Sequence, residues 1–314
     1  GDSINASFGD ESDPGVIIQS GEFDQVNISV AEAFYFKGLT MTPFDLTFTW
    51  ETGSNKYLMF GTLDAETSTG DKFTAAVGDG LDVLADITDG KVSQLSLGFT
   101  SDFIFRGLRI SPAEMTFEWN QDRFVIYGGA RVAVESDTLA ASFGTMNSPG
   151  MEIVDGTVDH VNIDVATNFD LKDLGLSPRD LSFEWDETSS GFIIYGDVGV
   201  TIENDSLEAT LGTASDPGIL IVSGELQYIS FSVSANFELK TLTIAPTNMT
   251  FEWDKSTNNY IFFGDVTVAT LGGDSFTGQL GSAANPGIQL VNGAVDHINL
   301  GVTADFSLKQ MQFT

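Results

Sequence analysis

The sequence contains no cysteine and only two histidines, His160 and His297, among its 314 residues. Without cysteine there can be no disulfide, no thiolate metal site and no cysteine nucleophile. Because the two histidines lie about two repeats apart, neither a histidine-based triad nor a multi-histidine metal site can assemble within the chain. The G-x-S-x-G, P-loop and G-x-G-x-x-G motifs are absent as well. We therefore predict that the chain is not an enzyme and has no catalytic, cofactor-binding or metal-binding residues.

Positive charge is also scarce. Thirteen Lys and Arg residues face 45 Asp and Glu residues, so the formal net charge is −32. Such a surface repels phosphate, which excludes nucleic acid as a partner and disfavours anionic lipid. No apolar run approaches the ~20 residues that a membrane-spanning helix needs, and no signal-peptide pattern is present. An acidic chain without cysteine suits an extracellular or cell-surface location, with the cytosol as the alternative.

What the sequence does contain is an internal repeat. The tryptophans end similar segments (LTFTW, MTFEW, LSFEW, MTFEW) with spacings of 69, 66 and 68 residues, at Trp50, Trp119, Trp185 and Trp253. Other residue types keep this register, namely Pro43, Pro112, Pro178 and Pro246, Gly21, Gly90, Gly156, Gly224 and Gly293, and Phe34, Phe103, Phe169, Phe237 and Phe306. Agreement among four residue types predicts tandem copies of about 68 residues. We predict repeats at 1–70, 71–136, 137–204 and 205–273, and a partial fifth repeat at 274–314.

Within a copy, apolar and polar residues alternate with the period of a β-strand. The alternation predicts one strand of about eleven residues at 161–171 and another at 229–239, each with one buried face. Met115, Phe117 and Trp119 predict a second apolar face, for which segments such as FVIYG, FIIYG and YIFFG supply the hairpin partner.

Turn signals separate the predicted strands. Type II turns are predicted at Pro14-Gly15, Pro149-Gly150, Pro217-Gly218 and Pro286-Gly287. The segments ESDT, ENDS and GGDS predict a further hairpin in each copy. With about six strands per copy, the fold class is all-β: a tandem array of ~68-residue antiparallel β repeats forming an elongated solenoid-like or superhelical rod.

The tryptophans have two interpretations. In Glu184–Asp186 and in Glu252–Asp254 an indole lies between two carboxylates, which would suit sugar binding if the ring were exposed. However, Trp185 shares its strand face with Leu181 and Phe183, and large aromatic residues on an alternating apolar face usually belong to the core. We therefore predict core tryptophans.

Two further sets of residues were weighed as sites. Calcium is the only cofactor for which the sequence offers ligands, at Asp79, Asp82, Asp86 and Asp89, but their spacing matches no known calcium loop and a solvated acidic loop is the favoured alternative. The two histidines occupy one repeat position that other copies fill with Gln25, Gln94 and Tyr228, which predicts a polar surface position. Glycosylation sequons occur at Asn5, Asn27, Asn204 and Asn248.

One repeat position carries five of the thirteen basic residues, at Lys37, Arg106, Lys172, Lys240 and Lys309. We call it the cation position. A cation held in place in an acidic array predicts a carboxylate partner, for which Glu118, Glu184 and Glu252 in the tryptophan strand are candidates. The alternative is a solubilising residue at a strand end.

These features favour a structural or adhesive segment (rod, stalk or filament) of a larger exported protein. Its partners would be further repeats or other copies of the same protein, placed end to end. In pattern alone, the short strands with one apolar face resemble the repeating β-groove lipid-transfer proteins and the AsmA-like β-taco proteins. That resemblance implies a lipid conduit with Val161, Ile163 and Phe169 on the groove floor. A carbohydrate-binding repeat array is the third hypothesis, and it rests on the tryptophan clusters.

Overall fold

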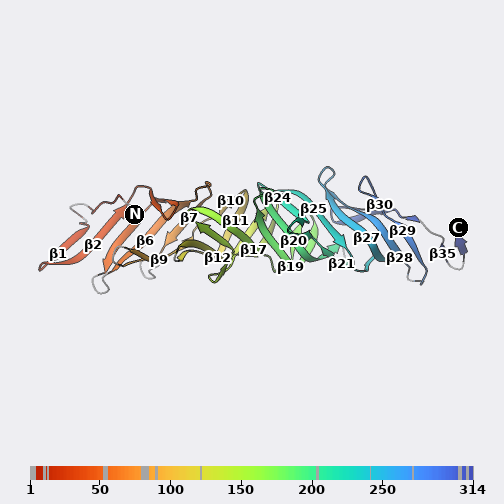
Figure 1. Ribbon diagram of the computed structural model, residues 1–314, viewed down its shortest axis with the longest axis horizontal. Coiled ribbons are helices and arrows are strands. Elements are labelled where there is room, and N and C mark those ends of the chain that lie inside the picture. The colour runs from red at the N-terminus through yellow and green to blue at the C-terminus, as the bar shows by residue number, and fades with distance from the viewer. Residues whose placement is uncertain are drawn as a thin grey trace. The chain divides into compact units, whose positions relative to one another are not determined.

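The computed structural model describes residues 5–9, 12, 14–51, 56–78, 85–88, 91–120, 122–202, 205–240, 242–270, 272–302, 306–308 and 311–313. This described part of the chain contains strands and turns and no helix (Figure 1). The strands pair antiparallel, and most of them belong to a large antiparallel sheet. The all-β antiparallel prediction is therefore confirmed, whereas the division into five repeats stays a prediction.

The chain divides into two compact units. The first comprises Gly1–Val132 and Ser142–Ile163, and the second comprises Ala133–Ala141 and Asp164–Thr314. The strands that lie mainly in the first unit are β1 (Val16–Gln19), β2 (Glu22–Val30), β3 (Phe34–Phe36), β4 (Leu39–Pro43), β5 (Leu46–Glu51), β6 (Lys56–Glu66), β7 (Lys72–Val77), β8 (Ala85–Thr88), β9 (Lys91–Phe99), β10 (Phe103–Phe105), β11 (Leu108–Asn120), β12 (Arg123–Val134), β14 (Gly144–Thr145), β15 (Ser148–Pro149), β16 (Met151–Val154) and β17 (Thr157–Asp164).

The strands that lie mainly in the second unit are β13 (Asp137–Ser142), β18 (Phe169–Leu171), β19 (Leu174–Asp186), β20 (Gly191–Ile202), β21 (Asp205–Thr210), β22 (Gly212–Thr213), β23 (Asp216–Pro217), β24 (Ile219–Val222), β25 (Glu225–Val233), β26 (Phe237–Leu239), β27 (Leu242–Asp254), β28 (Asn259–Ala269), β29 (Ser275–Gln279), β30 (Gly281–Ser282), β31 (Asn285–Pro286), β32 (Ile288–Val291), β33 (Ala294–Ile298), β34 (Gly301–Val302), β35 (Phe306–Leu308) and β36 (Met311–Phe313).

A long hairpin that contains the tryptophan is the main building element. In β19–β20, Trp185 lies opposite Phe192, and in β27–β28 Trp253 lies opposite Tyr260. The β5–β6 pair of the first unit has the same arrangement. We call this element the tryptophan hairpin, and its formation confirms the predicted pairing of the FIIYG and YIFFG segments.

The rest of a copy fills the sheet between two tryptophan hairpins of the second unit. The outer edge of β20 pairs with two strands placed end to end, with β24 along its first half and with β21 along its second half. Both of these strands pair with β25, and β25 pairs with β27. The β20–β21 and β28–β29 pairs confirm the hairpins predicted at ENDS and GGDS.

The eleven-residue strands predicted at 161–171 and 229–239 are wrong, because each is broken in the middle. In the second unit β25 pairs with Met249–Glu252 of β27, and β26 pairs separately with Leu242–Ile244. The stretch between these two paired segments holds Pro246, which has no N–H to give to a neighbouring strand. The row opposite the proline is therefore interrupted.

The same break affects residues 161–171, where β17 ends at Asp164 and β18 begins at Phe169. Thr167, which the alternation predicts to be buried, is exposed. Burial resumes in phase at Phe169 and Leu171.

The predicted Pro-Gly turns are also wrong. Pro149 lies in the two-residue strand β15, and Gly150 does not have a positive φ. The glycine is required by a close approach instead, since a Cβ at Gly150 would lie 2.5 Å from the carbonyl oxygen of Asn162 and 2.6 Å from Cα of Phe143. Gly218 and Gly287 are equally crowded by neighbouring backbone.

A β-bulge recurs in every copy. In each of the pairs β1–β2, β8–β9, β16–β17, β24–β25 and β32–β33 the second strand has one extra residue, namely Asp24, Ser93, Asp159, Gln227 and Asp296. The next residue in the chain is the position that His160 and His297 occupy. Both imidazoles are 43% exposed, which confirms the predicted surface position for these two copies.

The interior is apolar and aromatic. Phe251 is completely buried against three rings, with centroid distances of 4.0 Å to Phe231, 4.3 Å to Phe262 and 5.0 Å to Tyr260. In the first unit Met115, Phe117 and Trp119 are 5%, 0% and 8% exposed, which confirms the second apolar face.

Candidate functional site

The cation position lies in a tight hairpin turn with an unusual backbone conformation. The φ angles are 51° for Lys37, 48° for Arg106, 51° for Lys172 and 48° for Lys240. This left-handed region is costly for residues with a Cβ, by roughly 1–2 kcal/mol. A strained conformation that recurs with a cation indicates that surrounding contacts hold it there.

An aspartate binds the backbone of this turn. The N–H of Arg106 donates to Asp71 Oδ1 at 3.3 Å, and the N–H of Lys172 donates to Asp137 Oδ2 at 3.1 Å. The N–H of Lys240 donates in the same way to Asp205 at 3.3 Å. In each case the aspartate precedes the cation by 35 residues. Sequence reasoning missed this contact, although the recurrence of Asp at one fixed distance before the cation is a signal that could have revealed it.

The side chain of the cation reaches a tryptophan of the next predicted repeat. The Lys37 ammonium lies 5.1 Å from the centre of the Trp119 ring, and in the second unit the Lys172 ammonium lies 5.3 Å from that of Trp253. A cation over an indole face is attracted by the ring quadrupole, by about 0.5–2 kcal/mol depending on desolvation.

Glu135 completes the site in the second unit. Its carboxylate forms an ion pair with the Lys172 ammonium, and Oε1 accepts a hydrogen bond of 3.0 Å from the N–H of Leu226. Close by in sequence, the Leu171 carbonyl accepts a buried 2.7 Å hydrogen bond from the Tyr260 hydroxyl. One turn therefore joins segments that are 37 to 91 residues apart.

The corresponding turn of the first unit makes a backbone contact. A Cβ at Gly38 would lie 2.3 Å from the carbonyl carbon of Asp155, and one at Gly156 would lie 2.1 Å from the oxygen of Gly38. The Gly156 carbonyl also accepts 2.9 Å hydrogen bonds from the N–H and the hydroxyl of Ser68. Only glycine leaves room for two turns at this distance.

The predicted carboxylate partners of the cation are wrong. Glu118 accepts a 2.8 Å hydrogen bond from the Tyr127 hydroxyl, and Glu184 accepts one of the same length from Tyr195. Burial, together with the neighbouring glutamate, raises the pKa of both tyrosines. These carboxylates are one strand removed from the cation because they pair across the tryptophan hairpin.

The core prediction for tryptophan is confirmed for Trp119 and Trp253, which are 8% and 6% exposed. Trp50 and Trp185 are half-buried. The acids that follow the indoles stabilise turns: Asp254 accepts hydrogen bonds from the N–H and hydroxyl of Ser256, and these together with Thr257 lower its pKa.

One cluster of potential metal ligands lies on the β16–β17 bulge. Ligand atoms of Glu152, Asp159 and His160 all lie within 4.8 Å of one another. Arg123 already forms a 2.8 Å ion pair with Glu152, so a metal ion would have to compete with the guanidinium. Leu220 occupies the position of Glu152 in the next copy, so the cluster is not a feature of the repeat.

The remaining candidates from the sequence fall partly outside the described residues. These are Asp79, Asp82 and Asp89, the side chain of Asp86, Asn204 and Lys309. Of the other sequons, Asn5 and Asn248 are exposed and Asn27 is half-buried.

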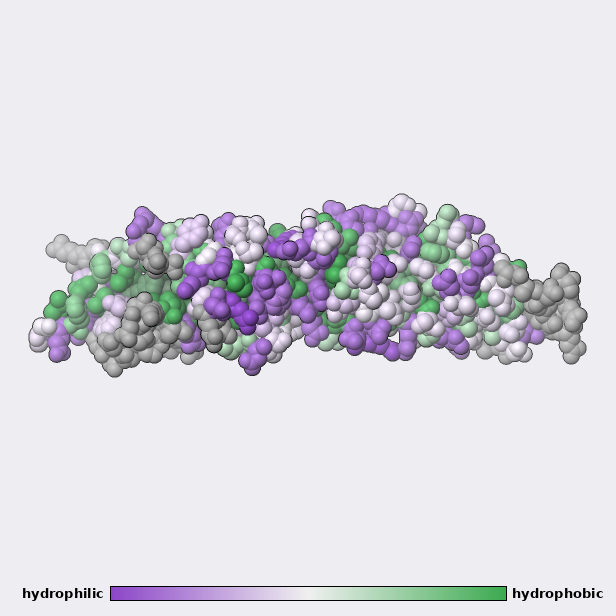
Figure 2. Space-filling model, in the orientation of Figure 1, coloured by the Kyte–Doolittle hydropathy of each residue, from purple (hydrophilic) through white to green (hydrophobic). Residues whose placement is uncertain are grey.

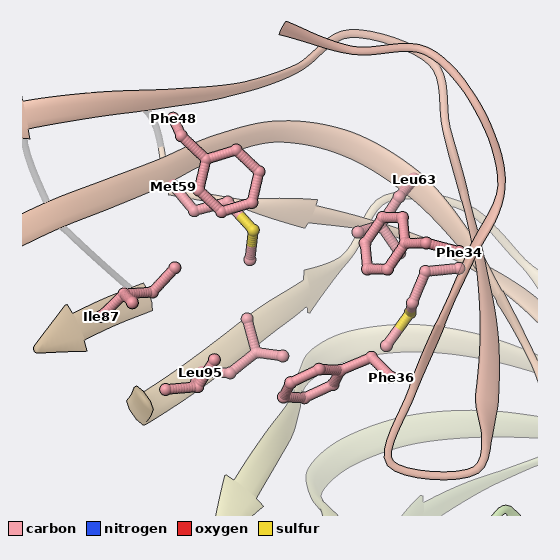
Figure 3. Close-up of a pocket in the computed structure, with 9 residues that line it drawn as sticks. Phe34, Phe36, Phe48, Met59, Leu63, Ile87 and Leu95 are labelled. Atoms are coloured by element: carbon pink, nitrogen blue, oxygen red, sulfur yellow. The ribbon is translucent and has the colours of Figure 1, made fainter. Parts of the chain in front are cut away.

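The first unit contains a small apolar cavity of about 40 Å³ (Figure 3). Phe34 and Phe36 line one side of it, and Phe48, Met59 and Ile87 line another. Its lining presents no polar surface. A volume of this size holds roughly three waters at ~10–15 Å³ each, and an apolar lining gives water no hydrogen-bond partner.

Comparison of the chain with protein-family models, with curated proteins and with solved structures finds no match in any of the three. None of the described residues forms a helix long and apolar enough to cross a bilayer.

Removal of the Lys172 charge tests the energetic role of the cation position. Burial pushes the pKa of Glu135 upward, but the hydrogen bonds from Lys172 and from the Leu226 N–H hold it below its usual range. A lowered folded-state pKa stabilises the fold above the unfolded pKa of about 4.3, and this stabilisation is lost as the pH falls through the folded value. We expect Lys172→Met to lower the free energy of unfolding by about 1–2 kcal/mol at pH 7 and by less at pH 3.

Arg179→Met is the matched control for urea unfolding at the two pH values. The Arg179–Glu208 ion pair is 2.6 Å long, but both side chains are more than half exposed, so its loss should cost under about 1 kcal/mol. Equal losses for the two variants would contradict a special role of Lys172.

Proposed function

We propose that the chain is a structural or adhesive segment (a rod, stalk or filament element) of a larger, exported protein at the cell surface. In this proposal its ~68-residue repeats stack into an elongated solenoid-like or superhelical rod. Stacked copies of one supersecondary unit extend a protein through nearest-neighbour contacts alone. The partners are further repeats or copies of the same protein, end to end.

The observation that carries the proposal is the contact between the cation and the tryptophan. Lys37 and Trp119 belong to predicted repeats 1 and 2, and Lys172 and Trp253 belong to predicted repeats 3 and 4. A residue that every copy retains is thus used to bind the following copy. The residues that differ among copies, such as the cluster around Glu152, lie elsewhere.

A lipid conduit is the second candidate, and the apolar cavity of the first unit favours it. The size of this cavity and the burial of the expected groove floor support the structural role more strongly. Val161, Ile163 and Phe169 are 3%, 0% and 7% exposed. For the carbohydrate-binding alternative, the burial of Trp119 and Trp253 leaves fewer indoles to stack on a sugar.

Small-angle scattering tests the proposal. A rod should give a radius of gyration well above the ~20 Å expected for one compact domain of this length. Mass spectrometry of organic extracts of the purified chain should find no stoichiometric lipid. A radius near ~20 Å would exclude the rod, and a bound lipid would favour the conduit.

A further inference from the structure

The outer edge of β1 lacks the neighbour that its counterparts have. In the later copies the equivalent strands β16, β24 and β32 pair on one side with the bulged strand and on the other side with the second strand of a tryptophan hairpin, β12, β20 or β28. Among the residues that the structure describes, β1 pairs with β2 alone. An unpaired strand edge is a template for an added strand.

The side chains around this edge are exposed only in the first copy. Phe8, Ile18 and Phe23 are 56%, 60% and 59% exposed. Their equivalents in the later copies are at most 4% exposed, namely Phe143, Leu211 and Leu280 for Phe8, Ile153, Ile221 and Leu290 for Ile18, and Val158 and Leu226 for Phe23. Figure 2 shows hydrophobic residues at the surface over β1 and β2, at the left of the view.

The later copies show what kind of strand covers this surface. Opposite Ile221 and Ile219 lie Phe192 and Ile194 of β20. Opposite Leu290 and Ile288 lie Tyr260 and Phe262 of β28. The covering strand therefore offers an aromatic residue and, two positions on, a large apolar residue on the same face.

We propose that the outer edge of β1, together with Phe8, Ile18 and Phe23, is a docking site for the tryptophan hairpin of a further repeat of this protein. The inference rests on the proposed function and names the contact through which repeats add. The hairpin's second strand pairs antiparallel with Val16–Gln19 and covers the three apolar side chains, as β20 covers β24. Recognition of this kind combines main-chain hydrogen bonds with pockets for alternate side chains.

The described second strands β6, β12, β20 and β28 are already paired with β8, β16, β24 and β32. A second intact copy of this chain therefore offers none of these strands in a free state, which is why a hairpin from a further repeat is the occupant.

The test adds a synthetic peptide with the sequence of residues 181–202 to the full chain. Hydrogen exchange of the amides of Val16–Gln19 should slow saturably, and binding should strengthen with salt because both partners are acidic. A peptide with Ile193→Pro should bind at least tenfold more weakly, since proline removes a ladder hydrogen bond.

Two variants of the chain make the test specific. Ile18→Asp should weaken peptide binding at least tenfold, whereas Ile104→Asp introduces the same charge at a position that is 64% exposed and outside the docking site, and should leave binding unchanged. Absence of protection at Val16–Gln19, or equal binding by both variants, would overturn the inference. Protection that appears without peptide as the chain dimerises would assign the edge to a second copy instead. A large radius of gyration without peptide binding would overturn this docking site alone and leave the proposed rod standing.

Discussion

Replacement of Trp253 by alanine is expected to lower the free energy of unfolding by about 3–5 kcal/mol. The indole is 6% exposed, its Nε1–H donates to Asn258 at 3.2 Å, and the Lys172 ammonium lies over its ring. The substitution removes a large buried surface, a hydrogen bond and a cation–π contact, and it leaves a cavity. Urea unfolding followed by far-ultraviolet circular dichroism measures the loss.

Trp50→Ala is the matched control. Trp50 occupies the same repeat position and packs against Tyr57 with a centroid distance of 4.8 Å, but it is only half-buried. We expect a loss of about half that of Trp253→Ala, because less surface is taken from water on folding. If Trp50→Ala destabilised the protein as much as Trp253→Ala, burial and the Lys172 contact would not explain the effect.

Replacement of Gly150 by alanine is expected to cost about 1–3 kcal/mol or more. The added Cβ would lie 2.5 Å from the Asn162 carbonyl oxygen and 2.6 Å from Phe143 Cα, and both are backbone atoms that cannot rotate away. The Gly150 N–H also donates to the Phe143 carbonyl at 2.5 Å, so the two segments cannot separate without loss of this bond. Thermal and urea unfolding of the purified variant measure the change.

Gly129→Ala serves as the control because its nearest neighbour would be the Ala113 Cβ at 4.0 Å, an ordinary contact. At such a site the substitution reduces the entropy of the unfolded chain, so it should be neutral or stabilise by up to about 1 kcal/mol. A neutral Gly150→Ala would mean that the backbone around Phe143 and Asn162 can shift apart freely, contrary to the packing described here.

The cation position illustrates how far sequence reasoning reached. Its recurrence showed that Lys37, Arg106, Lys172 and Lys240 share a role, and it correctly indicated a carboxylate partner. The partner itself was wrong, because it depends on which rows of the sheet meet at the turn. Glu135 lies 37 residues before Lys172 and Trp253 lies 81 residues after it, and no local pattern encodes such distances.

The breaks in the predicted strands have a similar origin. Alternation correctly assigned Phe169, Leu171 and Phe237 to the buried face, because it reports the direction of each side chain. It could not report that Pro246, in the neighbouring row, interrupts the hydrogen bonding between β25 and β26. The proline was visible in the sequence, but its effect falls on a strand to which it is joined only by the fold.

The sequence by itself determined the all-β class, the buried and exposed faces of the strands and the tryptophan hairpins, since each of these follows from alternation and local turn chemistry. The tertiary structure alone decided that Gly150 avoids a clash instead of forming a turn, that Lys172 is held between Glu135 and Trp253, and that Ile18 is exposed while Ile221 is buried. These three features depend on contacts between residues distant in the chain. Such contacts arise only when short strands from different segments are placed side by side in one sheet.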